Sequence, residues 1–249
     1  MASLRKRAAI QVTAPVVDYT AHGLRLNDEQ ISERMKEIGM TAVIFDAFGT
    51  LLKIQRGRHP YRTLLKIGVD HGRRPQPDDA TVLMTEPLEN LAAAAIRLGI
   101  TVKKSMLDEL EQVLADEVAG IEPFSDGLEA VALLQSEGVR VAVCSNLATP
   151  YRQAIRKHYP ALYAYVFSCD IGHIKPSAEI YKATCAALRA SPSGIHMIGD
   201  SKRCDCDGPG EIGIKGYFLD RSSQGGQYSD LLSFAQDFVR VTKCYGGFD

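Results

Sequence analysis

The stretch VIFDAFGTLL, residues 43–52, decides the fold because it joins a buried strand to a turn that carries reactive groups. Its apolar residues run without a break up to Phe45, which is typical of a strand buried on both faces. Asp46 follows at the tip of that strand, with Gly49 and Thr50 in the turn behind it. A carboxylate in this position predicts a nucleophile.

Strand and helix patterns alternate along most of the chain. Besides the strand at 41–48, strand patterns occur at 139–146, 163–170, 193–201 and 216–221. Helical patterns separate or follow them at 127–138, 150–159, 177–190, 207–214 and 231–241. This alternation predicts an α/β fold with a Rossmann-like parallel sheet as its core. In such sheets, ligands bind outside the carboxyl ends of the strands.

Residues 53–120 differ in character from the rest of the chain. Basic and turn-forming residues come first, and helical patterns follow at 90–100 and 104–120. The segment contains no convincing strand pattern. We therefore expect it to be an inserted helical cap domain, with hinges near 53–60 and 118–124, where glycine and proline cluster.

The expected core domain then consists of residues 41–52 and 121–249. Residues 1–40 precede it as an N-terminal extension and a short helix. Asn27 is the expected N-cap of that helix, and Gly39 its end.

Composition excludes several classes of partner. The 249 residues are 45% hydrophobic and carry a net charge of −1, so no overall field attracts nucleic acid or an anionic membrane. No apolar run reaches the about 18 residues of a transmembrane helix, and the basic N-terminus lacks the apolar stretch of a secretory signal. The six scattered cysteines are typical of reduced thiols, so we expect a cytoplasmic protein.

Reactive side chains stand at the ends of the predicted strands, where a parallel sheet would bring them together. They are Asp46, Thr50, Ser145, Asn146, Lys175, Asp200, Ser201 and Asp205. A carboxylate nucleophile, an anion-binding hydroxyl and a charge-balancing lysine suit an electrophile that carries negative charge. Asp46 and Asp200 could together hold Mg²⁺, which favours carboxylates, waters and phosphate oxygens.

Four segments in order, FDAFGTL, VCSN, IKPSAEIY and IGDSKRCD, resemble the four motifs of the haloacid dehalogenase-like (HAD) hydrolases. The resemblance covers roughly residues 41–221, and the helical insertion resembles the cap domain that the family places between its first two motifs. It implies a hydrolase that acts on a small, anionic molecule.

The resemblance also implies a role for each matching residue. Asp46 would attack the substrate and form a covalent aspartyl intermediate. Thr50, Ser145 and Asn146 would hold the transferring group, and Lys175 would balance the charge between nucleophile and substrate.

The same resemblance implies a metal site. Asp200 would bind Mg²⁺ together with Asp46 and the backbone carbonyl of Phe48, and Asp205 would support that site. The side chain of Phe48 would contact the substrate.

Phe48 is the departure from the phosphatase pattern. Family phosphatases usually carry a second aspartate there, which protonates the leaving alcohol, and such general acid–base help typically gives ~10²–10⁴ in rate. Family dehalogenases carry an aromatic residue there instead, but they use no Mg²⁺ and usually lack the acid at the position of Asp200. They also supply a cap arginine, and no arginine here aligns by spacing.

Three functions therefore stay open. The first is a Mg²⁺-dependent phosphatase of small phosphorylated metabolites, favoured because Asp200, Asp205 and Lys175 are all present. The second is a hydrolytic 2-haloacid dehalogenase, favoured by Phe48. The third is a HAD-like protein that binds its ligand and turns it over poorly.

Overall fold

The computed structural model describes residues 41–55 and 57–245. The expected extension and the helix capped by Asn27 lie outside the described residues. Within the described residues, a five-stranded parallel sheet forms the centre, in the order β5-β4-β1-β6-β7. Its strands are β1 (Ala42–Phe45), β4 (Arg140–Ser145), β5 (Ala164–Phe167), β6 (Ile195–Gly199) and β7 (Lys215–Phe218). The predicted α/β fold with a parallel, Rossmann-like sheet is confirmed.

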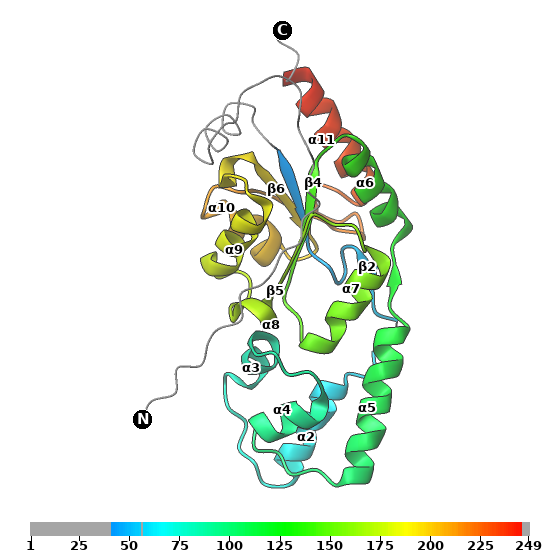
Figure 1. The fold of residues 1–249 in the computed structure, drawn as a ribbon, viewed down its shortest axis with the longest axis vertical. Coiled ribbons are helices and arrows are strands. Elements are labelled where there is room, and N and C mark those ends of the chain that lie inside the picture. The colour runs from blue at the N-terminus through cyan, green and yellow to red at the C-terminus, as the bar shows by residue number, and fades with distance from the viewer. Residues whose placement is uncertain (1–40, 56, 246–249) are drawn as a thin grey trace, which may run out of the picture. The chain divides into compact units, whose positions relative to one another are not determined.

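Helices connect the strands and cover both faces of the sheet. They are α6 (Ser125–Ser136), η1 (Thr149–Tyr151), α7 (Arg152–His158), α8 (Ser168–Ile171), α9 (Ala178–Leu188), η2 (Pro192–Gly194), η3 (Lys202–Asp207), α10 (Gly208–Gly210) and α11 (Leu231–Tyr245). Figure 1 shows α6 and α11 packed together on one side of the sheet and α9 on the other. Because crossover helices cover both faces, strands β1, β4 and β6 are almost fully buried, whereas the edge strand β7 is only partly buried.

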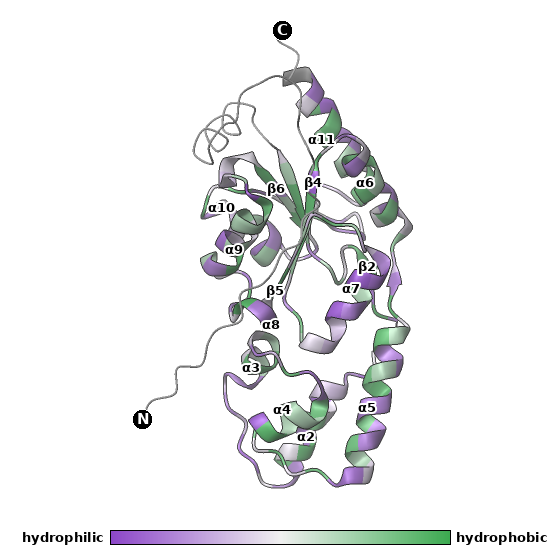
Figure 2. Ribbon diagram, viewed as in Figure 1, coloured by the Kyte–Doolittle hydropathy of each residue, from purple (hydrophilic) through white to green (hydrophobic). Residues whose placement is uncertain are grey.

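The central strand β1 contributes side chains to two separate cores. Val43 and Phe45 belong to the core that includes α6 and α11, where the ring of Phe45 meets the ring of Phe234 edge to face. Ala42 and Ile44 belong to the second core, under α9. Successive strand side chains point to opposite faces, so the unbroken apolar run serves both cores. Figure 2 shows this hydrophobic character on the strands.

The observed strands are shorter than the predicted strand patterns, and at 163–170 a helix replaces the missing part. The pattern at 163–170 predicts a single strand, but β5 ends at Phe167 and α8 starts at Ser168. The buried hydroxyl of Ser168 accepts a hydrogen bond from the backbone N of Leu147, at 3.0 Å. This hydrogen bond ties the start of α8 to the loop after β4.

The segment expected to be helical contains four helices: α2 (Pro60–Asp70), α3 (Asp79–Thr85), α4 (Leu91–Arg97) and α5 (Lys104–Ala119). A two-stranded antiparallel ribbon of β2 (Leu52–Lys53) and β3 (Glu122–Pro123) lies at its entry and exit. Lys53 is thus a strand residue in a segment expected to have none, while the five-stranded sheet takes no strand from residues 53–120. We refer to residues 53–120 as the helical insertion (Figure 1).

Arg73 organises the turn between α2 and α3. Its guanidinium makes a two-pronged ion pair with Asp79, with N–O distances of 2.5 and 2.7 Å, and its Nε donates to the carbonyl of Leu98 at 2.6 Å. The ion pair is shielded from solvent, so this basic residue serves the internal structure of the insertion.

Among the described residues, no helix combines the length and the apolar character that a membrane span requires.

Candidate active site

The loop after β1 places Asp46 at the carboxyl edge of the sheet. Asp46 is 6% exposed, and its backbone N donates to the carbonyl of Ile198 in the neighbouring strand β6. The chain then curls back, so that the backbone N atoms of Leu51 and Leu52 both donate to the carbonyl of Ala47, at 2.8 Å. The nucleophile predicted from the sequence therefore lies at the start of a compact, hydrogen-bonded turn.

Gly49 allows this turn to approach the next strand end. Its φ angle is +85°, a conformation that side chains with a Cβ rarely adopt. A Cβ at this position would lie 1.9 Å from Oδ2 of Asp200, so no larger residue fits without displacement. The neighbouring Thr50 is fully buried, and its Oγ1 accepts a hydrogen bond from the backbone N of Asp200 at 3.1 Å.

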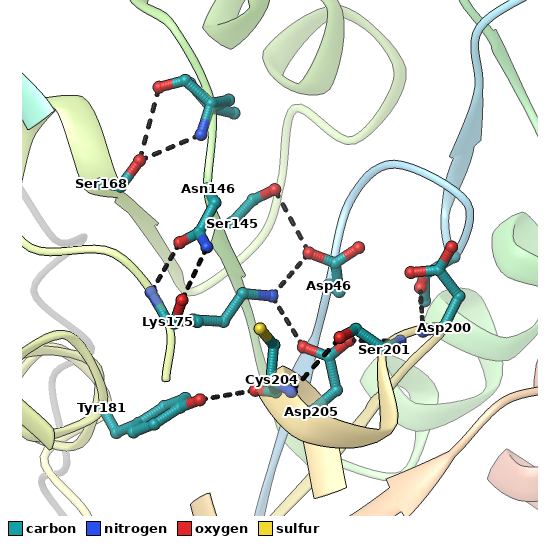
Figure 3. Close-up of polar contacts among 12 residues, drawn as sticks. Asp46, Ser145, Asn146, Ser168, Lys175, Tyr181, Asp200, Ser201, Cys204 and Asp205 are labelled. Atoms are coloured by element: carbon teal, nitrogen blue, oxygen red, sulfur yellow. Dashed lines mark hydrogen bonds and ion pairs between the residues drawn. The ribbon is translucent and has the colours of Figure 1, made fainter. Parts of the chain in front are cut away.

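Lys175 is the centre of a buried charge network (Figure 3). Its Nζ lies 2.6 Å from Oδ1 of Asp46 and 2.7 Å from Oδ1 of Asp205. Burial alone would lower the pKa of Lys175, but the charges of Asp46 and Asp205 outweigh it and hold that pKa well above the ordinary value. The ammonium group therefore stays charged between the two carboxylates.

Ser145 ends strand β4 and Asn146 follows it, and their side chains have different partners. The hydroxyl of Ser145 donates to Oδ1 of Asp46 at 3.3 Å. The amide of Asn146 instead binds the backbone of Lys175: its Nδ2 donates to the carbonyl at 3.0 Å, and its Oδ1 accepts from the N at 2.7 Å. Asn146 thus fixes the loop that carries the lysine, and its contact with a substrate stays a prediction.

The π-helical turn η3 supplies Asp205 from the other side of the site. Ser201 precedes this turn; its hydroxyl accepts from the backbone N of Cys204, while its own N donates to Oδ2 of Asp205 at 3.0 Å. The hydroxyl of Tyr181 binds the carbonyl of Cys204 at 2.6 Å and fastens the turn to α9. Both oxygens of Asp205 are therefore engaged within the protein, one of them with Lys175.

Three carboxylates converge at this edge. Asp46, Asp200 and Asp205 each offer an oxygen, and these oxygens lie within 4.8 Å of one another. Asp200 is partly open to solvent, yet its pKa is raised to about 6. The main cause is the packing around its carboxylate, and the charges of Asp46 and Asp205 add to it. Burial and the charge of Asp46 also raise the pKa of Asp205, against the opposing effect of Lys175. One lysine faces three acids, so the site favours an added cation.

The backbone of the turn leaves one carbonyl free. Among the described residues, the carbonyls of Ala47, Gly49, Thr50 and Leu51 all accept hydrogen bonds. The carbonyl of Phe48, between them, accepts none from the described residues. The resemblance to the HAD hydrolases implies that this carbonyl is a metal ligand, and no described group occupies its oxygen.

The side chain of Phe48 belongs to an aromatic wall, which we define as Phe48, Tyr151 and Tyr61. The Phe48 and Tyr151 rings pack edge to face with centroids 5.8 Å apart, and the Tyr61 ring lies 6.4 Å beyond. Burial raises the pKa of both tyrosines, so both hydroxyls are neutral. The wall joins the turn after the nucleophile to η1 and to helix α2 of the insertion.

The two tyrosine hydroxyls differ in their partners. The hydroxyl of Tyr151 donates to Oε1 of Glu117 on α5, and the other oxygen of Glu117 accepts from the backbone N of His59. The buried hydroxyl of Tyr61 has no hydrogen-bond partner among the described residues. Sequence reasoning missed Tyr151 and Glu117, because no local pattern pairs residues that lie 34 positions apart.

Comparison with known proteins agrees with this geometry. A family model described as haloacid dehalogenase-like hydrolase matches residues 40–213, which is more than half of the chain. No curated protein matches the chain in sequence.

Solved structures share the fold at low sequence identity. The HAD phosphatase from Thermococcus onnurineus is 18% identical with a TM-score of 0.55, covering 84% of this chain and 99% of its own. A HAD family enzyme from Bacteroides thetaiotaomicron, in complex with magnesium and inorganic phosphate, is 18% identical with a TM-score of 0.51, covering 73% and 94%. The L-2-haloacid dehalogenase from Xanthobacter autotrophicus is 19% identical with a TM-score of 0.50, covering 74% and 79%.

Proposed function

Because this chain belongs to the haloacid dehalogenase-like hydrolase family, we propose that it is a Mg²⁺-dependent phosphatase of small phosphorylated metabolites. The observation that carries the proposal is the convergence of three carboxylates. The Phe48 carbonyl, in the turn that starts at one of them, accepts no hydrogen bond from the described residues. Asp200 matters most among the three carboxylates. Its carboxylate makes no ion pair among the described residues, and burial followed by the charges of Asp46 and Asp205 raises its pKa to about 6.

The donor set fits Mg²⁺, which takes oxygen ligands and is usually held by one or two carboxylates, with waters and substrate phosphate completing its shell. Asp46, Asp200 and the carbonyl of Phe48 would hold the ion. Asp205 would act behind them, because its two oxygens are occupied by Lys175 and Ser201. When bound, the metal would supply positive charge for the phosphoryl oxygens.

The proposed reaction has two halves, the formation of an aspartyl phosphate and its hydrolysis. The carboxylate of Asp46 attacks phosphorus, the bond to the leaving oxygen breaks, and an aspartyl phosphate forms. Lys175 and the hydroxyls of Thr50 and Ser145 stabilise the charge on the phosphoryl oxygens. Water then attacks the same phosphorus, releasing phosphate and regenerating Asp46. The water supplies the proton that the leaving oxygen finally carries.

Phe48 limits which phosphates this site can cleave quickly. A phenyl ring donates no proton, so the leaving oxygen departs as an anion. Phosphates with acidic leaving groups, such as acyl phosphates and p-nitrophenyl phosphate, tolerate this, whereas simple alkyl phosphates do not. We therefore propose activated phosphates as the preferred class.

The experiment is a substrate panel measured with and without EDTA. Purified protein is incubated with acetyl phosphate, p-nitrophenyl phosphate and a simple sugar phosphate, and phosphate release is followed. We expect release from the first two, its loss in EDTA and its recovery with excess Mg²⁺. The Asp46→Asn variant, which keeps the shape and removes the attacking charge, is the matched control. Turnover by a folded Asp46→Asn protein would rule out the covalent mechanism.

A second candidate function is hydrolytic dehalogenation of 2-haloacids. The observation that favours it is the side chain of Phe48, which packs on Tyr151 and places an aromatic group where a proton donor would otherwise stand. Departing halide needs no proton. Halide release from 2-chloropropionate that persists in EDTA, without phosphate release from the panel, would establish this function instead.

The helical insertion supports either chemistry as a cap. Its contacts with the core run through α3 and α8, through α5 and α7, and through the bond from Tyr151 to Glu117. A cap of this kind excludes water and completes a site on closing. We propose a cytoplasmic enzyme whose partner is a small anionic substrate.

A further inference from the structure

We propose that Arg221 is a positioning residue, which holds the turn after Asp46 in its working conformation. This role rests on the proposed function, because it concerns the same site. Arg221 follows strand β7, yet its guanidinium reaches back to the turn. Its Nη2 donates to the carbonyl of Thr50 at 2.7 Å, and its Nε donates to the carbonyl of Gly49 at 3.3 Å.

The guanidinium is itself fixed from two further sides. Its Nη1 lies 3.0 Å from Oδ2 of Asp126, near the start of α6, and its carbon lies 3.8 Å from the centre of the Phe124 ring. Asp126 also accepts a hydrogen bond from the backbone N of Leu231, at 2.8 Å. The planar guanidinium is thus held between a ring and a carboxylate. Asp126 is anchored outside the turn through Leu231, whereas Phe124 is tied to the turn itself, because its backbone N donates to the carbonyl of Leu51.

These contacts decide where the groups of the turn point. The N of Gly49 donates to the carbonyl of Leu52, which fixes the peptide plane that carries the Phe48 carbonyl. Arg221 fixes the next two peptide planes through the carbonyls of Gly49 and Thr50. With all of these held, the orientation of the Phe48 carbonyl is fixed, and the Thr50 hydroxyl keeps its contact with the backbone N of Asp200.

Arginine suits this role better than lysine. Three of its nitrogen atoms reach three separate acceptors, on Gly49, Thr50 and Asp126. A lysine ammonium at the same place is a point charge on a flexible stem and would retain only part of this set. Arg221→Lys should therefore give an intermediate effect, because it keeps the attraction to Asp126 and loses the planar fork.

Arg140 offers a matched control in the same chain. Its Nη1 also donates to a backbone carbonyl, that of Leu188 at 2.9 Å, and its guanidinium also stacks on a ring, that of Tyr163 at 4.7 Å. It lies at the first residue of β4, at the sheet edge opposite to the candidate site. Arg140→Ala removes the same kinds of contact without touching the turn.

The experiment compares Arg221→Ala, Arg221→Lys and Arg140→Ala with the wild type by three measurements. Amide hydrogen exchange over residues 47–52 reports the order of the turn whatever the protein's activity is. Calorimetry reports the affinity for Mg²⁺ alone. Steady-state hydrolysis of p-nitrophenyl phosphate separates kcat from KM. If Arg221→Ala does not fold, Arg221→Lys is compared with the wild type and with Arg140→Ala in its place.

We expect only the Arg221 variants to exchange faster over residues 47–52. Mg²⁺ affinity should fall by about 10–100-fold in Arg221→Ala, as is usual when a group that orients metal ligands is lost. The kcat should fall by about 10²-fold with little change in KM, the usual cost of a reacting group misplaced by about 1 Å. Arg221→Lys should lie between.

Exchange and Mg²⁺ affinity equal to those of Arg140→Ala would overturn the role of Arg221. A wild type without phosphatase activity would overturn the proposed function alone. The exchange comparison would then still decide the role of Arg221 in the turn, and the split between kcat and KM would be measured on halide release.

Discussion

The ammonium nitrogen of Lys175 lies 2.6 Å from Oδ1 of Asp46 and bridges that carboxylate to Asp205. Lys175 is 4% exposed, and Asp205 is fully buried. An intact buried ionic group can contribute little net stability. Removing one of its members is nevertheless strongly destabilising, because the remaining charges stay buried without a partner. The same contact orients the carboxylate of the proposed nucleophile.

Replacing Lys175 by Met should both abolish turnover and destabilise the protein. The substitution keeps the length of the side chain but leaves Asp46 and Asp205 facing each other without a cation. We expect a loss of about 3–5 kcal/mol in the free energy of unfolding, measured in urea. Adding Asp205→Asn should recover part of the stability and none of the activity. Equal stability of wild type and Lys175→Met would contradict the importance of this charge network.

Replacing either tyrosine of the aromatic wall by phenylalanine removes one hydroxyl, but we expect only one of the two substitutions to lower the stability of the protein. Tyr151→Phe removes a hydroxyl that donates to Glu117, so we expect a loss of about 1–3 kcal/mol in the free energy of unfolding. Tyr61→Phe removes a buried hydroxyl that has no partner among the described residues, so stability should be unchanged or slightly higher. Thermal and urea unfolding of the two variants test this. A larger loss in Tyr61→Phe than in Tyr151→Phe would be the opposite of what the contacts imply.

Local patterns in the sequence predict the sheet and the reactive edge well. The apolar run that ends at Phe45 is enough by itself to predict a buried strand. A parallel sheet then brings the carboxyl ends of its strands to the same edge. Asp46, Ser145 and Lys175 therefore meet as expected. The resemblance between motifs works for the same reason, because each motif sits on one strand end and the spacing within it is local.

Contacts between distant segments could not be predicted in this way. Arg221 reaches Thr50 across 171 positions, and nothing in the segment around either residue indicates the other. Asn146 shows a related limit. The sequence predicts a polar group at the site, but only the fold shows that the Asn146 amide is hydrogen-bonded to the backbone of Lys175. Side-chain partners depend on packing, whereas strand ends depend on local pattern.

His196 should make the protein less stable in mild acid. Burial first, and then the charge of Lys215, lowers the pKa of this histidine from 6.5 to about 4. Its ring packs on Phe238 and shares a hydrogen bond with the hydroxyl of Tyr217. The unfolded chain thus binds a proton below pH 6.5 that the folded protein takes up only near pH 4. The stability due to neutral His196 is complete above pH 6.5 and is lost as the pH falls toward 4.

The size of this loss is on the order of 3 kcal/mol, since one pKa unit corresponds to about 1.4 kcal/mol. Urea unfolding at several pH values between 4 and 7 measures it. His196→Gln, which does not titrate, is the control. The raised pKa of Asp200 acts with the opposite sign in the same range, so the difference between the two proteins isolates the histidine. Parallel pH curves for wild type and variant would contradict the prediction.

Phe48→Asp should convert the site toward ordinary phosphate esters. A carboxyl group here could protonate the leaving oxygen, so turnover of simple alkyl phosphates should rise by up to ~10²–10⁴-fold if the carboxyl reaches that oxygen. Phe48→Asn is the matched control, since it has the same shape and cannot act as an acid. The exchange also removes the edge-to-face contact with Tyr151, which costs about 0.5–1.5 kcal/mol beyond the lost burial, so unfolding is measured first. The gain should be small for p-nitrophenyl phosphate, whose leaving group needs no proton. A folded Phe48→Asp protein that hydrolyses alkyl phosphates no faster than Phe48→Asn, and has lost halide release, would identify Phe48 as part of a dehalogenase site.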